Sequence, residues 1–261
     1  MNKTLIIIIA CILNILGIIV FVMNMIEMYE NPKKEYIYII NNNKIKKINV
    51  ENELELENLE KPVIYVQGSV HGNEPAGSKV SMKILNEIRQ NRFNKYKGTI
   101  IIFPYPNIEG IKLNQRFVPE LLPYDINRSF TNSNTRMIPN KIMKIVRNSD
   151  FIIDLHEGWG YHLEDKGSVG STLGPTTKYS TKLSIEIIDQ LNKNIKEEYK
   201  KFSMNNSDDC SITTTLRCYS SKLNKHYILV ETTGQNNKQP INIRVDQMYT
   251  IITHVFDNFL Y

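Results

Sequence analysis

The sequence is poor in cysteine, with three cysteines among 261 residues. Three cysteines do not make the disulfide framework of a small secreted domain, so we expect the fold to depend on a hydrophobic core. Cys210 and Cys218 lie close together in the sequence. They either pair or remain two unlinked small hydrophobic residues, and the sequence leaves both possibilities open.

The sequence also lacks a concentrated basic segment. The formal net charge is +5, but the lysines are spread along the chain and do not form a stripe interleaved with aromatic residues. Nucleic-acid-binding domains usually carry such a stripe. We therefore predict no nucleic-acid partner, and the sequence leaves the oligomeric state open.

No internal repeat and no linker rich in glycine, serine or proline divides residues 35–261. A long apolar run does occur near the amino end, over residues 5–26, and it contains no charged residue. A helix of roughly 20 apolar residues spans a bilayer. We therefore predict two parts: a membrane anchor with its linker over 1–34, and one folded domain over 35–261.

The anchor sequence favours a retained helix, since no clear small-residue cleavage site follows the apolar run. A removed signal peptide is the alternative. Lys3 lies on one side of the run, and Lys33 and Lys34 lie on the other, so the positive-inside rule leaves the orientation open. The predicted localisation is a membrane-anchored protein whose folded domain is extracytoplasmic.

Short apolar segments alternate with longer amphipathic ones along residues 35–261. The short segments are rich in β-branched residues, which is typical of strands buried on both faces of a sheet. The pattern predicts an α/β fold. The predicted elements are a hairpin over 35–40 and 44–50, strands over 63–66, 99–103, 151–155 and 227–230, and helices over 75–91, about 140–147, about 178–201 and 241–260.

Polar side chains follow three of the predicted strands. His71 and Glu74 follow the strand over 63–66, His156 ends the strand over 151–155, and Glu231 ends the strand over 227–230. In open α/β sheets, ligands bind outside the carboxyl ends of the strands. We therefore expect these four side chains to converge at one edge of the sheet.

Two histidines and one carboxylate form the ligand set of a catalytic zinc site, because they leave one position open for water. His71, Glu74 and His156 fit this set, with one Zn²⁺ per chain. Taken alone, His71 is an ordinary loop histidine and Glu74 an acid placed near a helix amino end. A second alternative draws a ligand from the residues after the strand, namely Glu157, His162 or Glu164.

The remaining charged groups fit hydrolysis by activated water. Glu231 is the candidate general base. Arg116 is the candidate group for the oxyanion, and Arg128 with Asn127 is a candidate clamp for a substrate carboxylate. Each arginine, taken alone, is more typical of an exposed surface residue.

Together these motifs resemble those of the zinc carboxypeptidases and of the related succinylglutamate desuccinylase/aspartoacylase enzymes. The resemblance extends over residues 62–260. The motifs that carry it are HGNE (71–74), PNIEG (106–110), DINRSF (125–130), DLH (154–156) and VETTGQ (230–235).

The resemblance implies a three-layer αβα fold with a mixed, mostly parallel sheet of about eight strands. It implies Zn²⁺ held by His71, Glu74 and His156, Glu231 as general base, and Arg116 as the oxyanion group. It also implies the carboxylate clamp of Asn127 and Arg128, and Asp125 as the residue that orients the first zinc histidine. The resemblance thus implies the same roles for the candidate residues named above, and it adds a role for Asp125.

The sequence also departs from the family. Aspartoacylase-like enzymes carry a further β-rich domain, whereas about thirty residues follow Glu231, which suffice for one closing helix. The substrate-covering tyrosine of digestive carboxypeptidases has no counterpart that spacing identifies. Trp159, Tyr161 and Arg217 are candidate residues of the specificity pocket, although ordinary packing or exposure is the better explanation for each of them.

From these residues we predict a zinc hydrolase that cleaves an amide bond next to a free carboxylate, on a small peptide or an N-acyl amino acid. One alternative is a module that binds carboxylate ligands without catalysis. Another is a zinc-dependent esterase.

Overall fold

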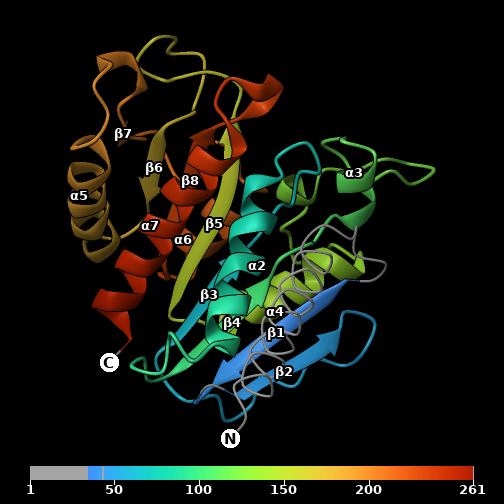
Figure 1. The fold of residues 1–261 in the computed structure, drawn as a ribbon. Helices are drawn as coiled ribbons and strands as arrows, with labels where there is room; N and C mark the ends of the chain where they lie inside the picture. Colours follow the sequence, from blue (N-terminus) through green and yellow to red (C-terminus); the bar gives the residue numbers. More distant parts are fainter. Residues whose placement is uncertain (1–34, 43, 261) are drawn as a thin grey trace, which may run out of the picture. The chain divides into compact units, whose positions relative to one another are not determined.

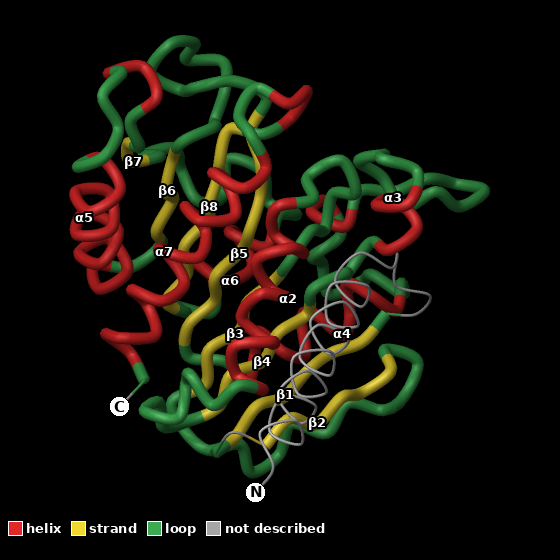
Figure 2. Tube along the Cα trace, in the orientation of Figure 1, coloured by secondary structure: helices red, strands yellow, loops and turns green. Residues whose placement is uncertain are grey.

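The computed structural model describes residues 35–42 and 44–260 (Figure 1). Their strands form one sheet in the order β2-β1-β4-β3-β5-β8-β6-β7, which Figure 2 traces from edge to edge. The strands are β1 (Tyr36–Asn41), β2 (Lys44–Asn49), β3 (Val63–Gln67), β4 (Thr99–Phe103), β5 (Phe151–Gly158), β6 (Thr172–Pro175), β7 (Ser203–Met204) and β8 (His226–Thr233).

The central strands β4, β3, β5 and β8 run parallel to one another, and β1 and β6 pair antiparallel on either side of them. The sheet is therefore mixed, as predicted. The helices are α2 (Ala76–Arg89), α3 (Ile108–Lys112), α4 (Met137–Asn148), α5 (Lys178–Asn192), α6 (Leu216–Lys222) and α7 (Ile241–Phe259), with short 3₁₀ turns at Ile126–Arg128, Glu198–Lys200 and Gln235–Asn237.

Two apolar cores lie on opposite faces of the sheet. Helices α2, α5 and α7 cover one face together with Ile64 and Val66 of β3, and Figure 1 shows α2 and α7 crossing this face. Helices α4 and α6 cover the other face together with Val63 and Tyr65. Because successive strand residues point to opposite faces, β3 is buried along its whole length. The predicted three-layer αβα architecture is confirmed.

Burial of these strands supplies much of the driving force for folding. Ile64, Ile101, Ile152 and Ile228 are fully buried. Each contributes roughly 1.5–3 kcal/mol relative to an exposed side chain. This stabilisation fixes the strand ends that carry the site described below.

Helix α5 differs from the prediction, since it ends at Asn192 and does not continue to residue 201. The Asn192 side chain accepts a hydrogen bond from the Phe202 amide and donates one to the Phe202 carbonyl. These two bonds hold the returning chain beside the helix end, where it enters β7. The short elements β6, β7, α3 and α6 were not predicted.

The predicted membrane anchor over 5–26 lies outside the described residues. In the part of the chain that the structure describes, every helix is too short or too polar to cross a bilayer. The predicted localisation, a membrane-anchored protein with an extracytoplasmic domain, is contradicted by this finding.

Candidate metal centre

The parallel strands bring the predicted metal ligands to one edge of the sheet. His71 and Glu74 lie in the loop between β3 and α2, and His156 lies near the carboxyl end of β5, which is the neighbour of β3. Gly72 in this loop lies directly against the backbone of α3, since a Cβ atom there would fall 1.9 Å from the Gly110 carbonyl carbon. The loop thus depends on a residue without a side chain.

Three side chains present donor atoms to one point. One atom each from His71, Glu74 and His156 lies within 4.8 Å of the others, and all three residues are buried. The Nδ1 atom of His71 is 2.8 Å from Oε1 of Glu74, and Nδ1 of His156 is 3.0 Å from Oε2. This cluster has the donor set and spacing to hold a metal ion.

Each histidine is oriented through its other ring nitrogen. Oδ1 of Asp125 lies 3.0 Å from Nε2 of His71, and Oδ1 of Asp154 lies 3.3 Å from Nε2 of His156. When Nε2 donates to a carboxylate, Nδ1 carries the lone pair that a metal requires. Both Nδ1 atoms face Glu74, so the tautomers that these carboxylates favour are the ones that bind metal.

Asp154 was not predicted as a site residue. It is fully buried on β5, where it also accepts hydrogen bonds from Gln67 at 2.6 Å and from the Tyr227 hydroxyl at 2.7 Å. The sequence did carry a signal, because Asp154 and His156 are two residues apart in one strand and therefore share a face. Its three polar neighbours hold the carboxylate in place beneath His156.

The electrostatics of the cluster favour a cation. Burial raises the pKa of the Glu74 carboxyl, but His71 and His156 outweigh this effect and hold that pKa well below its ordinary value. Burial lowers the pKa of His156, but Asp154 and Glu74 outweigh this effect and raise it well above its ordinary value. The carboxylates around the two imidazoles thus favour positive charge at this point.

Glu74 also accepts hydrogen bonds from β5 and from the turn that follows β8. Its carboxylate accepts hydrogen bonds from the Glu157 backbone amide at 3.1 Å and from Nε2 of Gln235 at 3.1 Å. Gln235 also donates to the Glu157 carbonyl at 2.6 Å. Gln235 was not assigned a role from the sequence, because its position depends on the turn that follows β8.

Glu231 lies beside the cluster on β8, directly opposite His156 in the parallel pairing. It is 9% exposed and lines the cleft, and none of the described residues donates a hydrogen bond to its carboxyl group. Burial raises the pKa of Glu231 to about 8, with Glu74 and Asp154 adding to the effect and His156 opposing it. A carboxyl group with a pKa near neutral is suited to proton transfer.

The predicted substrate-binding side chains also line this cleft. Arg116 forms an ion pair with Asp125 at 3.0 Å and approaches Oε1 of Glu74 to 3.5 Å. Asn127 places Nδ2 3.3 Å from Nε2 of His156, while Arg128 is exposed and donates to the Asn127 carbonyl. All three residues therefore border the space above the cluster, and Arg128 is the most exposed of them.

The cleft has a volume of about 270 Å³, near the lower limit of roughly 300–1,000 Å³ that is usual for ligand pockets. Beyond the cluster it is bordered by Trp159, Leu229 and Arg217 and by the loop that follows β7. Trp159 and Arg217, two of the predicted pocket residues, thus lie in the cleft. Tyr161 lies in a different cavity.

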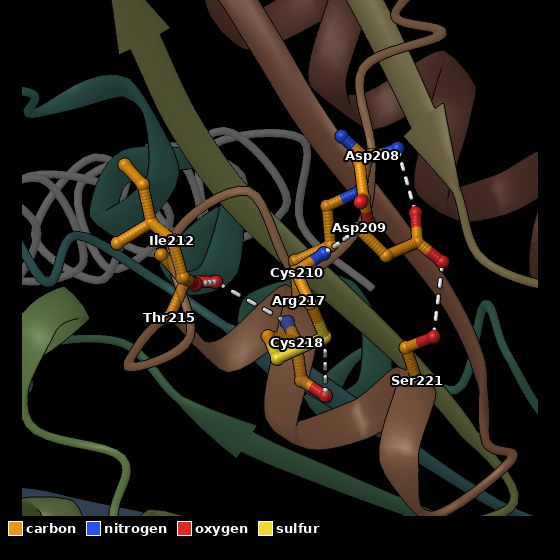
Figure 3. The surroundings of a disulfide bond; sticks show 8 residues. All are labelled: Asp208, Asp209, Cys210, Ile212, Thr215, Arg217, Cys218 and Ser221. Atoms are coloured by element: carbon orange, nitrogen blue, oxygen red, sulfur yellow. Dashed lines mark hydrogen bonds and ion pairs between the residues drawn. A yellow bond between two sulfur atoms is a disulfide. The ribbon is translucent and has the colours of Figure 1, made fainter.

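A disulfide between Cys210 and Cys218 closes the loop at the far end of the cleft (Figure 3). Beside it, the Asp209 carboxylate accepts a hydrogen bond from Ser221 at 3.0 Å and pairs with Arg217 at 2.9 Å. Arg217 is 7% exposed. The disulfide that the sequence left open is therefore formed, and it lies next to a mostly buried ion pair that borders the cleft.

The alternative metal ligands lie elsewhere. Glu157 points to the other face of β5, where its carboxylate accepts a hydrogen bond from the Ala76 amide and pairs with Arg244. Nδ1 of His162 lies 2.7 Å from the Ser168 carbonyl, and Glu164 is exposed in the loop after β5. The structure brings none of the three into the His71, Glu74 and His156 cluster.

The chain resembles known proteins both in sequence and in fold. Residues 60–160 match the model of the succinylglutamate desuccinylase/aspartoacylase catalytic domain. No curated protein sequence matches the chain.

Several solved structures share the fold. Helicobacter pylori Csd4, described as a D,L-carboxypeptidase, is 17% identical, with 76% of this chain and 51% of Csd4 covered and a TM-score of 0.61. A Shewanella denitrificans protein proposed to be a metallopeptidase is 17% identical, with 93% and 90% covered and a TM-score of 0.57. The ectoine utilization protein EutE of Ruegeria pomeroyi is 12% identical, with 88% and 69% covered and a TM-score of 0.55.

This chain spans about half the length of Csd4. At these identities the structures establish a common fold, and the match over residues 60–160 covers the segment that contains His71, Glu74 and His156. The resemblance to the succinylglutamate desuccinylase/aspartoacylase enzymes that the sequence predicts is confirmed over residues 60–160, and the described residues share their fold with Csd4 and with the Shewanella denitrificans protein.

Proposed function

We propose that this protein is a zinc-dependent hydrolase that cleaves an amide bond next to a free carboxylate. The observation that carries the proposal is the position of Glu231, a buried carboxyl group without a hydrogen-bond donor among the described residues, beside a cluster of two imidazoles and one carboxylate. Two imidazoles and one carboxylate are a usual catalytic zinc set. Zinc held there would make water a better nucleophile and polarise a carbonyl group.

The protein side chains would then move protons and position the substrate. Glu231 takes a proton from the attacking water and delivers it to the leaving nitrogen. Arg116, which points to the cluster while Asp125 holds it, stabilises the negative charge that develops on the carbonyl oxygen. Asn127 and Arg128 bind the substrate carboxylate at the rim of the cleft.

The substrate class follows from the cleft and its charges. A space of about 270 Å³ accommodates a small peptide end or an N-acyl amino acid. Csd4 has been solved with a bound tripeptide, which supports a peptide. EutE is an ectoine utilization protein solved with its product bound, which supports including N-acyl amino acids among the candidate substrates.

The test is hydrolysis by the purified full chain, loaded with zinc, of a panel of dipeptides, N-acyl amino acids and the matching esters. We expect amide hydrolysis that requires the free carboxylate. Glu231→Gln should retain its zinc yet lose at least about a hundredfold in kcat, the usual scale of general acid-base catalysis. The exposed Glu164→Gln is the matched control and should remain active.

Two results would count against the proposal. Full activity of Glu231→Gln would remove Glu231 from proton transfer. Saturable binding without any product, across the whole panel and with zinc bound, would show a carboxylate-binding module, and cleavage of the esters alone would show an esterase.

A further inference from the structure

Large apolar side chains gather in the outer part of the cleft, beyond the metal cluster. Trp159 is 45% exposed, Val169 is 38% exposed and Ile212 is 43% exposed, and all three line the cleft. Trp159 and Val169 lie in the loop after β5, whereas Ile212 lies in the loop after β7. Single exposed apolar residues are ordinary, but several at one concave site mark a surface that binds a ligand. The outer part of the cleft is therefore suited to an apolar group.

The charged residues of this outer part already have partners within the protein. Arg217 pairs with Asp209 at 2.9 Å and donates to Oγ of Ser207 at 3.0 Å. Asp208 is exposed to water, and its carboxylate accepts a hydrogen bond from the Cys210 amide at 2.8 Å. A charged substrate side chain would lose its water here without meeting a buried, unpaired group of opposite charge among the described residues of this wall. Covering this part of the cleft therefore favours an apolar group over a charged one.

The loop that carries Ile212 is fixed from more than one side. The disulfide between Cys210 and Cys218 ties the loop to α6, and Arg217 of the same helix donates to the Ser207 carbonyl at 3.1 Å. Figure 3 shows the Ile212 side chain pointing away from the disulfide. A loop that is already fixed loses little conformational freedom when a ligand covers it. Ile212 is therefore held in position for contact with a substrate.

We propose that Trp159 and Ile212 make the enzyme selective for substrates with an apolar group, which packs against both side chains. The inference rests on the proposed function, because Asn127 and Arg128 must bind the substrate carboxylate in the same cleft. The apolar group can belong to the residue that carries the carboxylate or to the residue on the other side of the cleaved amide. Arg217 then holds the loop and does not itself select the substrate.

The experiment compares four acetylated dipeptides as substrates of the zinc-loaded full chain. Acetyl-Gly-Leu carries the apolar group on the carboxylate side, acetyl-Leu-Gly carries it on the other side, acetyl-Gly-Gly lacks it, and acetyl-Gly-Glu replaces it by a charge. We expect kcat/KM for at least one leucine peptide to exceed that for acetyl-Gly-Gly by about tenfold or more, the scale of covering an apolar side chain. The leucine peptide that is preferred identifies the side on which the apolar group binds.

Variants of the apolar wall test whether these two residues cause the preference. Trp159→Ala and Ile212→Ala should each lower the ratio of kcat/KM for the preferred leucine peptide to that for acetyl-Gly-Gly by about threefold or more, because each removes part of the apolar contact. Leu163→Ala and Ile185→Ala are the matched controls, since Leu163 is 39% exposed in the loop of Trp159, Ile185 is 50% exposed on α5, and both lie outside the cleft. The ratio should be unchanged in both controls.

A fluorescence titration follows binding without hydrolysis. Trp159 is the single tryptophan of the chain, so the emission reports on this part of the cleft alone. In the zinc-loaded Glu231→Gln variant, a leucine peptide that covers the indole should shift the emission to shorter wavelength at saturation. Acetyl-Gly-Gly should give a smaller shift, because it leaves the indole in contact with water.

Two kinetic results would overturn the inference: leucine peptides that are cleaved no better than acetyl-Gly-Gly or less well than acetyl-Gly-Glu, or a preference that survives unchanged in both Trp159→Ala and Ile212→Ala. If the wild type hydrolyses none of the peptides, the proposed function fails and the titration decides the inference alone. A saturable shift with a leucine peptide would then support the apolar site, and the absence of any shift would overturn it.

Discussion

The buried ion pair between Glu157 and Arg244 gives the sharpest prediction of stability. Glu157 is fully buried and the Arg244 side chain is 4% exposed. The pair joins β5 to α7 just behind the metal cluster, and Gly234 lies so close over it that a Cβ atom there would fall 1.6 Å from the Glu157 carboxylate. Little space is therefore left for water or another side chain to neutralise the Glu157 carboxylate if Arg244 is removed.

Replacing Arg244 by methionine keeps the length of the side chain and removes its charge. Breaking a buried pair by removing one partner typically costs about 3–5 kcal/mol. The Glu157 carboxylate would still accept the hydrogen bond of 2.6 Å from the Ala76 amide at the start of α2, where the helix dipole also favours an anion. We therefore expect a loss of about 3 kcal/mol, at the lower end of the range.

The loss should depend on pH in a defined direction. Burial raises the pKa of Glu157 above its ordinary value, and Arg244 opposes this effect. Without Arg244 the pKa of Glu157 in the folded protein rises further. The loss of folding free energy caused by the unpaired carboxyl group is therefore complete only above that raised pKa. It disappears as the pH falls to the value of an unfolded glutamate, near 4.3. The destabilisation should thus be largest at pH 8 and small at pH 4.

Urea unfolding, followed by circular dichroism and by the fluorescence of Trp159, measures the effect. Arg92→Met is the matched control, because the Arg92 side chain is 64% exposed and its ion pair with Glu87, at 3.7 Å, should contribute less than about 1 kcal/mol. The double change Glu157→Gln with Arg244→Met should recover part of the loss. A loss below about 1 kcal/mol at pH 8, or one that is equal at pH 4 and pH 8, would refute the reasoning.

Two further changes test other parts of the structure. Gln235→Leu removes a hydrogen bond to Glu74 and should weaken zinc binding about 10- to 100-fold without unfolding the protein. Competition with a chelator measures the zinc affinity, and an unchanged affinity would contradict the prediction. Burial raises the pKa of Glu35 to about 7, so its ionisation above that pH opposes folding. Glu35→Gln should therefore add roughly 1–2 kcal/mol to the free energy of unfolding at pH 8, a value discounted for partial exposure from about 1.4 kcal/mol per pKa unit. At pH 4 the gain should be almost zero. Urea unfolding measures both gains, and an equal gain at the two pH values would contradict the prediction.

The elements that the sequence predicts well are those with a strong apolar pattern. The runs at 63–66, 99–103, 151–155 and 227–230 became β3, β4, β5 and β8, because a strand buried on both faces is apolar throughout. Strands β6 and β7 are short and partly polar, and β6 contains Gly174 and ends at Pro175. Their pairing with the sheet depends on contacts with distant segments that no local pattern reveals.

The site residues on strand ends could likewise be predicted from the sequence, whereas those in turns could not. Strand ends predicted that His71, Glu74, His156 and Glu231 would meet, and the parallel pairing of the strands brings them together. Strand alternation also excludes Glu157 as a ligand, since adjacent residues of a strand point to opposite faces. Gln235 and the Cys210 disulfide lie in turns, where the geometry rather than the residue pattern decides the contacts.

The central claim is that His71, Glu74 and His156 hold one zinc ion, and elemental analysis of the purified full chain tests it most directly. The account predicts one zinc per chain in the wild type, its loss in His156→Ala, and its retention in the matched control His162→Ala. Zinc that remains in His156→Ala, or that disappears from His162→Ala, would contradict the account.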